Sequence, residues 1–95
     1  METLFIEPTE KTPLVILDAK NSKFELIGVS VPESGADFYK PVLNWLTAYS
    51  EKPLKETVLV VNLDYFNISS SKMILFMFYK LMEIRDKGKN VKVHW

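Results

Sequence analysis

Runs of apolar residues along the chain predict five strands. These segments are rich in β-branched and aromatic residues, and they cover residues 3–7, 13–19, 23–31, 57–66 and 90–95. Lys20-Asn21-Ser22 separates the second segment from the third and predicts a hairpin turn, because Asn tolerates a left-handed backbone. Residues 58–61 are apolar without alternation, which predicts a central strand that is covered on both faces.

Two further segments show the spacing of a helix. The first follows the strand-breaking Pro32, and the spacing of Ser34 and Asp37 resembles a capping box. Its apolar stripe predicts core positions at Phe38, Val42, Trp45, Leu46 and Tyr49. Pro41 lies inside this helix and predicts a first turn that is separate or kinked. The second helix covers residues 72–86 and is expected to end with Gly88 in a C-cap position.

The predicted order of elements is therefore β-β-β-α-β-α-β. A hairpin that leads into β-α-β-α-β implies right-handed crossovers and a mixed sheet. The predicted fold class is α/β, with a five-stranded mixed sheet and two main helices in a single domain over residues 1–95. Two helices are too few to cover both faces of such a sheet. Either one face stays partly open, or both helices lie on the same side.

The composition is that of an ordinary globular protein. Of the 95 residues 47% are hydrophobic and 25% charged, and twelve Lys+Arg balance twelve Asp+Glu. This neutrality argues against nucleic-acid binding, and the one locally basic stretch, residues 87–92, is interpreted as an exposed turn after a helix. The N-terminus lacks the apolar core of a secretion signal, and no apolar run approaches the roughly 20 residues of a membrane span. A cytoplasmic protein without nucleic-acid or membrane contacts is expected.

The chain offers little material for catalysis or metal binding. It has no cysteine, which excludes disulfides and thiol nucleophiles. His94 is the only histidine, and no HxH, HExxH or carboxylate cluster accompanies it, so it is expected to be a solvent-facing strand residue. The three glycines form no phosphate-binding loop. We therefore expect no enzyme, no cofactor and no metal ion.

The second predicted helix is apolar around much of its girth. Its main stripe comprises Ile74, Met77, Phe78 and Leu81. Phe76 and Tyr79 lie off this stripe, close to Lys72. A helix of this kind is either deeply buried or presents a second apolar surface. Both alternatives stay open: Phe76 and Tyr79 are buried, or they contact a partner.

Asn67-Ile68-Ser69-Ser70-Ser71 lies between the longest predicted strand and the second helix. One serine suffices to cap a helix by accepting hydrogen bonds from its free N–H groups, a contribution of about 1 kcal/mol. The three serines follow the carboxyl end of a central strand, where open α/β sheets place their ligand sites. A phosphate there would face the positive end of the helix dipole. The serines are therefore either helix caps only or a site of phosphorylation.

Three stretches together resemble the SiaC family of bacterial regulatory phosphoproteins. They are "SVPESGADFYKPVLNWL", "VNLDYFNISSSKMIL" and "GKNVKVHW", and the likeness runs from about Phe5 to Trp95. Proteins of this family resemble the STAS domains of anti-anti-sigma factors, which implies a STAS-like fold. The family's proteins continue past the tryptophan that corresponds to Trp95 into an acidic tail.

The resemblance implies a non-catalytic signalling protein that works by partner switching. A dedicated kinase and phosphatase act on a hydroxyl residue at the start of the second helix. The unphosphorylated form binds and activates a partner, a diguanylate cyclase in the best-known member, and so promotes biofilm formation. In this family the phosphate lies on the residue directly after the Asn that corresponds to Asn67, and here that residue is Ile68.

Ile68 cannot be phosphorylated, so two alternatives follow. In the first, Ser69 or Ser70 takes the phosphate, in the loop formed with Asn67, Ile68 and Ser71, and Phe76, Tyr79 and Lys72 contact the partner. In the second, the chain is a constitutive protein-interaction or homodimerisation module, and its serines only cap the helix. A small nucleotide-binding domain is a third alternative, because some STAS domains resemble one, but the sequence shows no polar pocket for it.

Overall fold

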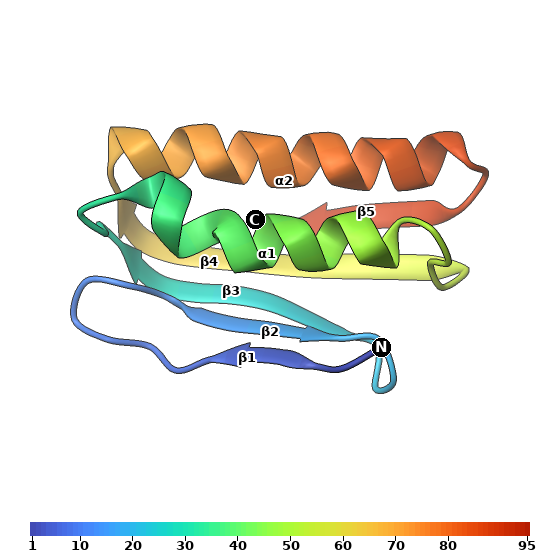
Figure 1. The fold of residues 1–95 in the computed structure, drawn as a ribbon, viewed down its shortest axis with the longest axis horizontal. Coiled ribbons are helices and arrows are strands. Elements are labelled where there is room, and N and C mark those ends of the chain that lie inside the picture. The colour runs from blue at the N-terminus through green and yellow to red at the C-terminus, as the bar shows by residue number, and fades with distance from the viewer.

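Five strands and two helices follow one another in the predicted order (Figure 1). A computed structural model describes all residues from Met1 to Trp95. The elements are β1 (Leu4–Ile6), β2 (Leu14–Asp18), β3 (Lys23–Ser30), α1 (Gly35–Tyr49), β4 (Glu56–Phe66), α2 (Ile68–Asp86) and β5 (Asn90–His94). The strands agree with the predicted segments to within one residue at each end, and α2 begins earlier than predicted.

The strands form one mixed sheet in which their order equals their order in the chain, β1-β2-β3-β4-β5. β1, β2 and β3 pair antiparallel, whereas β3, β4 and β5 pair parallel. Because the three parallel strands succeed one another in one direction across the sheet, right-handed crossovers carry both helices to the same face. Figure 1 shows α1 and α2 side by side on that face.

The core lies between the two helices and the covered face of the sheet. Its buried members recur at every second residue in the strands and at helical spacing in the helices: Val15, Leu17, Phe24, Leu26, Leu59, Val61, Tyr39, Val42, Leu46, Tyr49, Ile74, Met77, Leu81 and Ile84. Val58 and Val60 alternate with these residues on the opposite face and are only half-buried. The prediction that β4 is covered on both faces is therefore wrong, because no helix crosses to the second face.

The first helix begins as predicted. Ser34 is its N-cap, and the Ser34 hydroxyl oxygen accepts a hydrogen bond of 3.2 Å from the Asp37 backbone N–H. The helix then runs through Pro41 to Tyr49 as one element, so the first turn is not separate. Its capped start positions the residues that adjoin the beginning of α2.

The aromatic residues of α1 divide differently from the prediction. Tyr49 is buried as expected, but Phe38 and Trp45 are half-buried at the margin of the core. The Trp45 indole N–H donates to the Glu2 carbonyl, 2.8 Å away, which accounts for its position at the margin. Tyr39, outside the predicted stripe, is fully buried because its hydroxyl finds a polar partner in the sheet.

Two turns lie at the end of the domain opposite the start of α2. In the β2–β3 hairpin the left-handed residue is Ser22 (φ 54°), not Asn21 as predicted. Asn21 instead bonds to the Asp18 carboxylate through its backbone and side-chain N–H groups. Gly88 follows the last turn of α2 at φ 90°, which confirms its predicted role in ending that helix.

Candidate functional site

The second helix begins immediately after β4, with Asn67 as its N-cap. The Asn67 side-chain oxygen accepts hydrogen bonds from the Ser70 backbone N–H (2.9 Å) and from the Ser69 hydroxyl (3.2 Å). The Asn67 amide donates to the Pro32 carbonyl, 3.3 Å away, and so ties the loop to the segment before α1. These bonds hold the segment between β4 and α2 in place. The cap is this asparagine and not a serine, and the serines lie inside the helix's first turn.

The three serines have different environments, because successive helical residues point about 100° apart. Ser70 is fully buried, and its hydroxyl donates to the Ser30 carbonyl at 2.9 Å. Ser71 is exposed, and its hydroxyl donates back to the Ile68 carbonyl at 2.7 Å. Ser69 is exposed, with only the longer bond to the Asn67 side chain. Of the two predicted phosphorylation candidates, Ser69 is accessible and Ser70 is not.

A chain of buried hydroxyl groups joins the start of α2 to β3 and α1. The Ser30 hydroxyl lies 2.7 Å from the Tyr39 hydroxyl and donates to the Ser70 hydroxyl at 2.8 Å. Burial raises the pKa of Tyr39 above its ordinary value of 10.0, and its hydrogen bonds with Ser30 and Ser70 oppose this effect. Sequence reasoning missed Ser30 and Tyr39, since neither follows a polar pattern on its own element.

The N-terminal ends of both helices meet at Ser69. A Cβ atom added to Gly35, the first residue of α1, would lie 2.7 Å from the Ser69 carbonyl oxygen and 2.9 Å from its hydroxyl oxygen. Only a glycine permits so close an approach. Two helix dipoles thus present their positive ends near the Ser69 hydroxyl, an arrangement that favours negative charge there.

Ile68 extends into solvent at the first position of α2. Its side chain is 89% exposed, more than any other large hydrophobic residue of the chain. It makes no contribution to the core, so the isoleucine at this position is not explained by packing.

The outward side of α2 carries the second apolar surface that the sequence left open. We call it the α2 outer surface, and it comprises Leu75, Phe76, Tyr79 and Met82. Phe76 and Tyr79 are 36% and 50% exposed, so they are not buried in the core. The centres of their rings lie 6.3 Å apart. The Lys72 ammonium lies 6.0 Å from the centre of the Phe76 ring, a cation–π contact at the edge of this surface. The predicted partner-contact residues therefore lie together, one to three turns from Ser69.

No three His, Cys, Asp or Glu side chains come together in a way that could hold a metal ion. His94 is exposed on β5, as expected of a solvent-facing strand residue. None of the helices has the length and apolar character needed to cross a membrane.

The fold and the site are those of an α/β domain in which a helix begins with an accessible hydroxyl and carries an exposed apolar surface. The model of the SiaC family, described as a SiaC family regulatory phosphoprotein, matches residues 6–95. The chain belongs to this family, which confirms the resemblance seen in its sequence.

Solved structures support the same assignment. The chain is similar to SiaC of Pseudomonas aeruginosa, with a TM-score of 0.93 and 26% identity over 100% of this chain and 78% of that chain. The apo-SiaC crystal structure from the same organism gives the same values. SiaC in complex with diguanylate cyclase SiaD, for which it is the activator, matches with a TM-score of 0.89 over 97% of this chain and 75% of that chain. A comparison with curated proteins gives no match.

Proposed function

We propose that this chain is a non-catalytic regulator that binds and activates a diguanylate cyclase, under the control of a kinase and a phosphatase. The observation that carries the proposal is the α2 outer surface, whose exposed aromatic side chains Phe76 and Tyr79 lie about two and three helical turns from the accessible Ser69 hydroxyl. Exposed aromatic groups of this kind are frequent anchors of protein interfaces. The likeness to SiaC, an activator in complex with a diguanylate cyclase, supports the choice of partner.

We also propose that residues 1–95 act as a single domain. The terminal strands support this, since Leu4 and Ile6 at one edge and Val91 at the other pack against the same core. Both helices contribute buried residues to that core, and no second core is present.

Ser69 is the proposed phosphate acceptor. Ile68 has no hydroxyl, and the buried Ser70 hydroxyl is committed to Ser30. A kinase needs access to the acceptor oxygen, which Ser69 provides in the folded state. A phosphate on Ser69 would also lie where the two helix dipoles favour negative charge.

A phosphate on Ser69 would alter the α2 outer surface by charge. Lys72 is three residues further along the helix, the spacing of neighbouring side chains. A phosphoserine, with about −1.5 to −2 charges, would attract the Lys72 ammonium away from the Phe76 ring. It would also place a strongly hydrated group at the edge of the apolar surface, where a partner would have to desolvate it. Both effects oppose docking.

The test is an activation assay with a purified diguanylate cyclase of the same organism. Ser69→Asp should abolish activation, whereas Ser69→Ala should retain it. Tyr79→Ala should weaken partner binding about tenfold or more, because truncation of an aromatic anchor at an interface typically has an effect of this size. Phe5→Ala is the matched control, since Phe5 is similarly exposed on the far edge strand β1. Equal effects of Ser69→Asp and Ser69→Ala would contradict the charge mechanism. Equal effects of Tyr79→Ala and Phe5→Ala would contradict the hypothesis that the partner docks on the α2 outer surface.

One observation favours the constitutive alternative. Leu75 and Tyr79 follow Ile68 by seven and eleven residues, a spacing that places all three on one side of α2. The exposed Ile68 side chain therefore extends the α2 outer surface. Mass spectrometry of the native protein separates the two hypotheses, because trypsin releases residues 56–72 as one peptide with all three serines. A phosphate on Ser69 in some growth condition supports the switch. An unmodified peptide in every condition supports a constitutive binder.

A further inference from the structure

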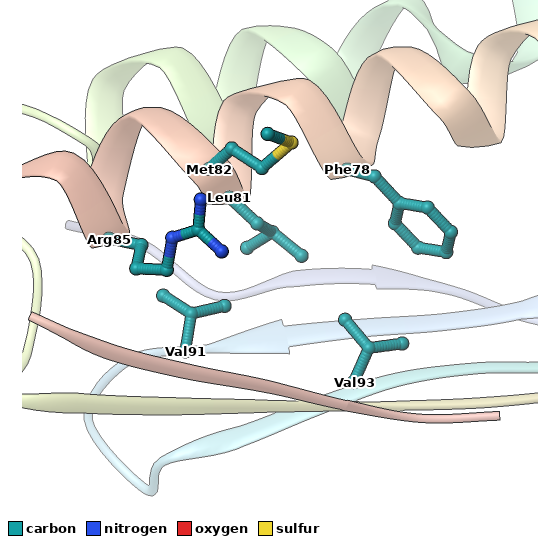
Figure 2. A pocket seen from close by; sticks show the side chains of 6 residues that line it. All are labelled: Phe78, Leu81, Met82, Arg85, Val91 and Val93. Atoms are coloured by element: carbon teal, nitrogen blue, oxygen red, sulfur yellow. The ribbon is translucent and has the colours of Figure 1, made fainter.

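The other end of α2 forms a second surface together with the edge strand β5. A pocket of about 250 Å³ opens between the last turns of the helix and this strand (Figure 2). Its lining is apolar except for one guanidinium group, and it consists of Phe78, Leu81, Met82, Arg85, Val91 and Val93. Small-molecule sites usually measure about 300–1,000 Å³. This pocket is therefore better matched to one apolar side chain than to a whole metabolite.

The backbone beside the pocket is free to bind another strand. The Asn90 N–H donates to the Lys55 carbonyl at 2.9 Å, toward β4. Along a strand the backbone groups of successive residues point to alternate sides, so those of Val91 and Val93 point away from β4. β5 is the last strand of the sheet and has no neighbour on that side. The two residues that offer free N–H and C=O groups therefore also line the pocket.

The segment that contains β5 carries a net positive charge in a chain that is neutral as a whole. Four of the five charged residues in the segment 85–95 are basic: Arg85, Lys87, Lys89 and Lys92, with Asp86 as the exception. Arg85 pairs with Asp86, and the Lys87 ammonium donates to the Ser50 carbonyl beyond α1, so Lys89 and Lys92 carry the unpaired positive charge. Lys92 alternates with Val91 and Val93, so its side chain lies on the opposite face of the sheet. The edge thus presents apolar side chains and the pocket on one face, and a basic side chain on the other.

We propose that β5 binds an extended segment of a partner protein in which apolar residues alternate with Asp or Glu. The segment adds to the sheet as a further strand, bonded to the backbone of Val91 and Val93. One of its apolar side chains fills the pocket, and an acidic side chain on the other face pairs with Lys92. A second copy of this chain fits less well, because its β5 has no Asp or Glu that could pair with Lys92. The surface shares only Met82 with the α2 outer surface and does not depend on the proposed cyclase partner.

The test uses a synthetic, terminally blocked heptapeptide in which Leu alternates with Glu, and the same peptide with Lys in place of Glu. Amide hydrogen exchange of the whole chain is followed by NMR during titration. The Leu/Glu peptide should slow exchange at the Val91 and Val93 N–H groups, while the Leu/Lys peptide should not. If the exchange rates of the Val91 and Val93 N–H groups stay unchanged up to the highest Leu/Glu peptide concentration, the proposal is overturned.

Two variants and a control locate the binding. Lys92→Glu should weaken peptide affinity about tenfold, because an attraction is replaced by a repulsion. Val93→Pro should abolish binding, because it removes an outward N–H without removing a bond to β4. Lys11→Glu makes the same charge change in the exposed β1–β2 loop and should leave affinity within about twofold of the original.

Equal losses from Lys92→Glu and Lys11→Glu would refute β5 as the binding site. The peptide-free protein should remain monomeric in light scattering as its concentration rises. A dimer that Val93→Pro converts to monomer would instead assign the edge to a second copy and overturn the proposal.

Discussion

Replacement of Gly35 by alanine tests how closely the two helix starts approach each other. A methyl group at this position would lie 2.7 Å from the Ser69 carbonyl oxygen, about 0.7 Å short of the 3.4 Å at which ordinary contact begins. The obstacle is backbone and not the end of a flexible side chain, so α1 and α2 must move apart. Overpacking of this kind costs about 1–3 kcal/mol, whereas Gly→Ala in a helix gains up to about 1 kcal/mol. We expect a net loss of roughly 1 kcal/mol in the free energy of unfolding.

For a chain of this length a loss of 1 kcal/mol lowers Tm by about 4–8 °C. Thermal unfolding followed by circular dichroism measures it, and urea unfolding gives the free energy directly. Ser69→Ala is the matched second variant, because it removes the hydroxyl but leaves the carbonyl oxygen in place. The double variant should be no more stable than Gly35→Ala alone. A Tm that is unchanged or raised by Gly35→Ala, or restored in the double variant, would refute the proposed backbone contact.

Three further predictions concern the same helix start and one distant turn. Asn67→Ala removes the N-cap and should lower the free energy of unfolding by about 0.5–2 kcal/mol, measured by urea denaturation. Ser70→Asp should prevent stable folding, because it buries a carboxylate, whereas Ser69→Asp should leave Tm unchanged or slightly raised, since its charge is exposed at a helix N-terminus. Hydrogen bonds from Asn21 lower the pKa of Asp18 below 3.8, so this carboxylate stabilises the fold above pH 4 and loses its contribution as the pH falls through the lowered pKa. The Asp18→Asn variant should therefore show a smaller decline of Tm between pH 5 and pH 2, and an unchanged decline would contradict this assignment.

Much of the architecture could be predicted from periodicity and turn residues alone. The strands at 13–19 and 23–31, the order of elements and the cap at Ser34 follow from short-range patterns, which the chain expresses locally. The covering of β4 could not be predicted, because its four successive apolar residues are compatible with burial on one face or on two. The strand order across the sheet decides this: the three parallel strands follow one another in one direction, so right-handed crossovers place both helices on the same face.

The candidate site was predictable in position but not in internal geometry. Asn67 and Ser69 come from a polar segment between a strand and a helix, and that signal is local. The burial of Ser70 depends on Ser30 and Tyr39, which are 40 and 31 residues away in the chain. Sequence alone gives no indication that these three hydroxyl groups converge. Phe76 and Tyr79 were ambiguous for the same reason, since their exposure depends on the position of α1 beside α2.

The hydroxyl chain also limits how a phosphate could act on this protein. Two hydrogen bonds hold the start of α2: the Ser70 backbone N–H donates to the Asn67 side chain, and the buried Ser70 hydroxyl donates to the Ser30 carbonyl. The Ser69 hydroxyl takes part in neither bond. A phosphate on Ser69 would therefore leave the helix folded and would act on the charge of the surface beside Phe76. A switch that melts the helix would require modification of the buried serine, to which a kinase has no access. We therefore propose that a phosphate on Ser69 regulates through surface charge with an unchanged fold, since this mechanism agrees with the placement of both serines.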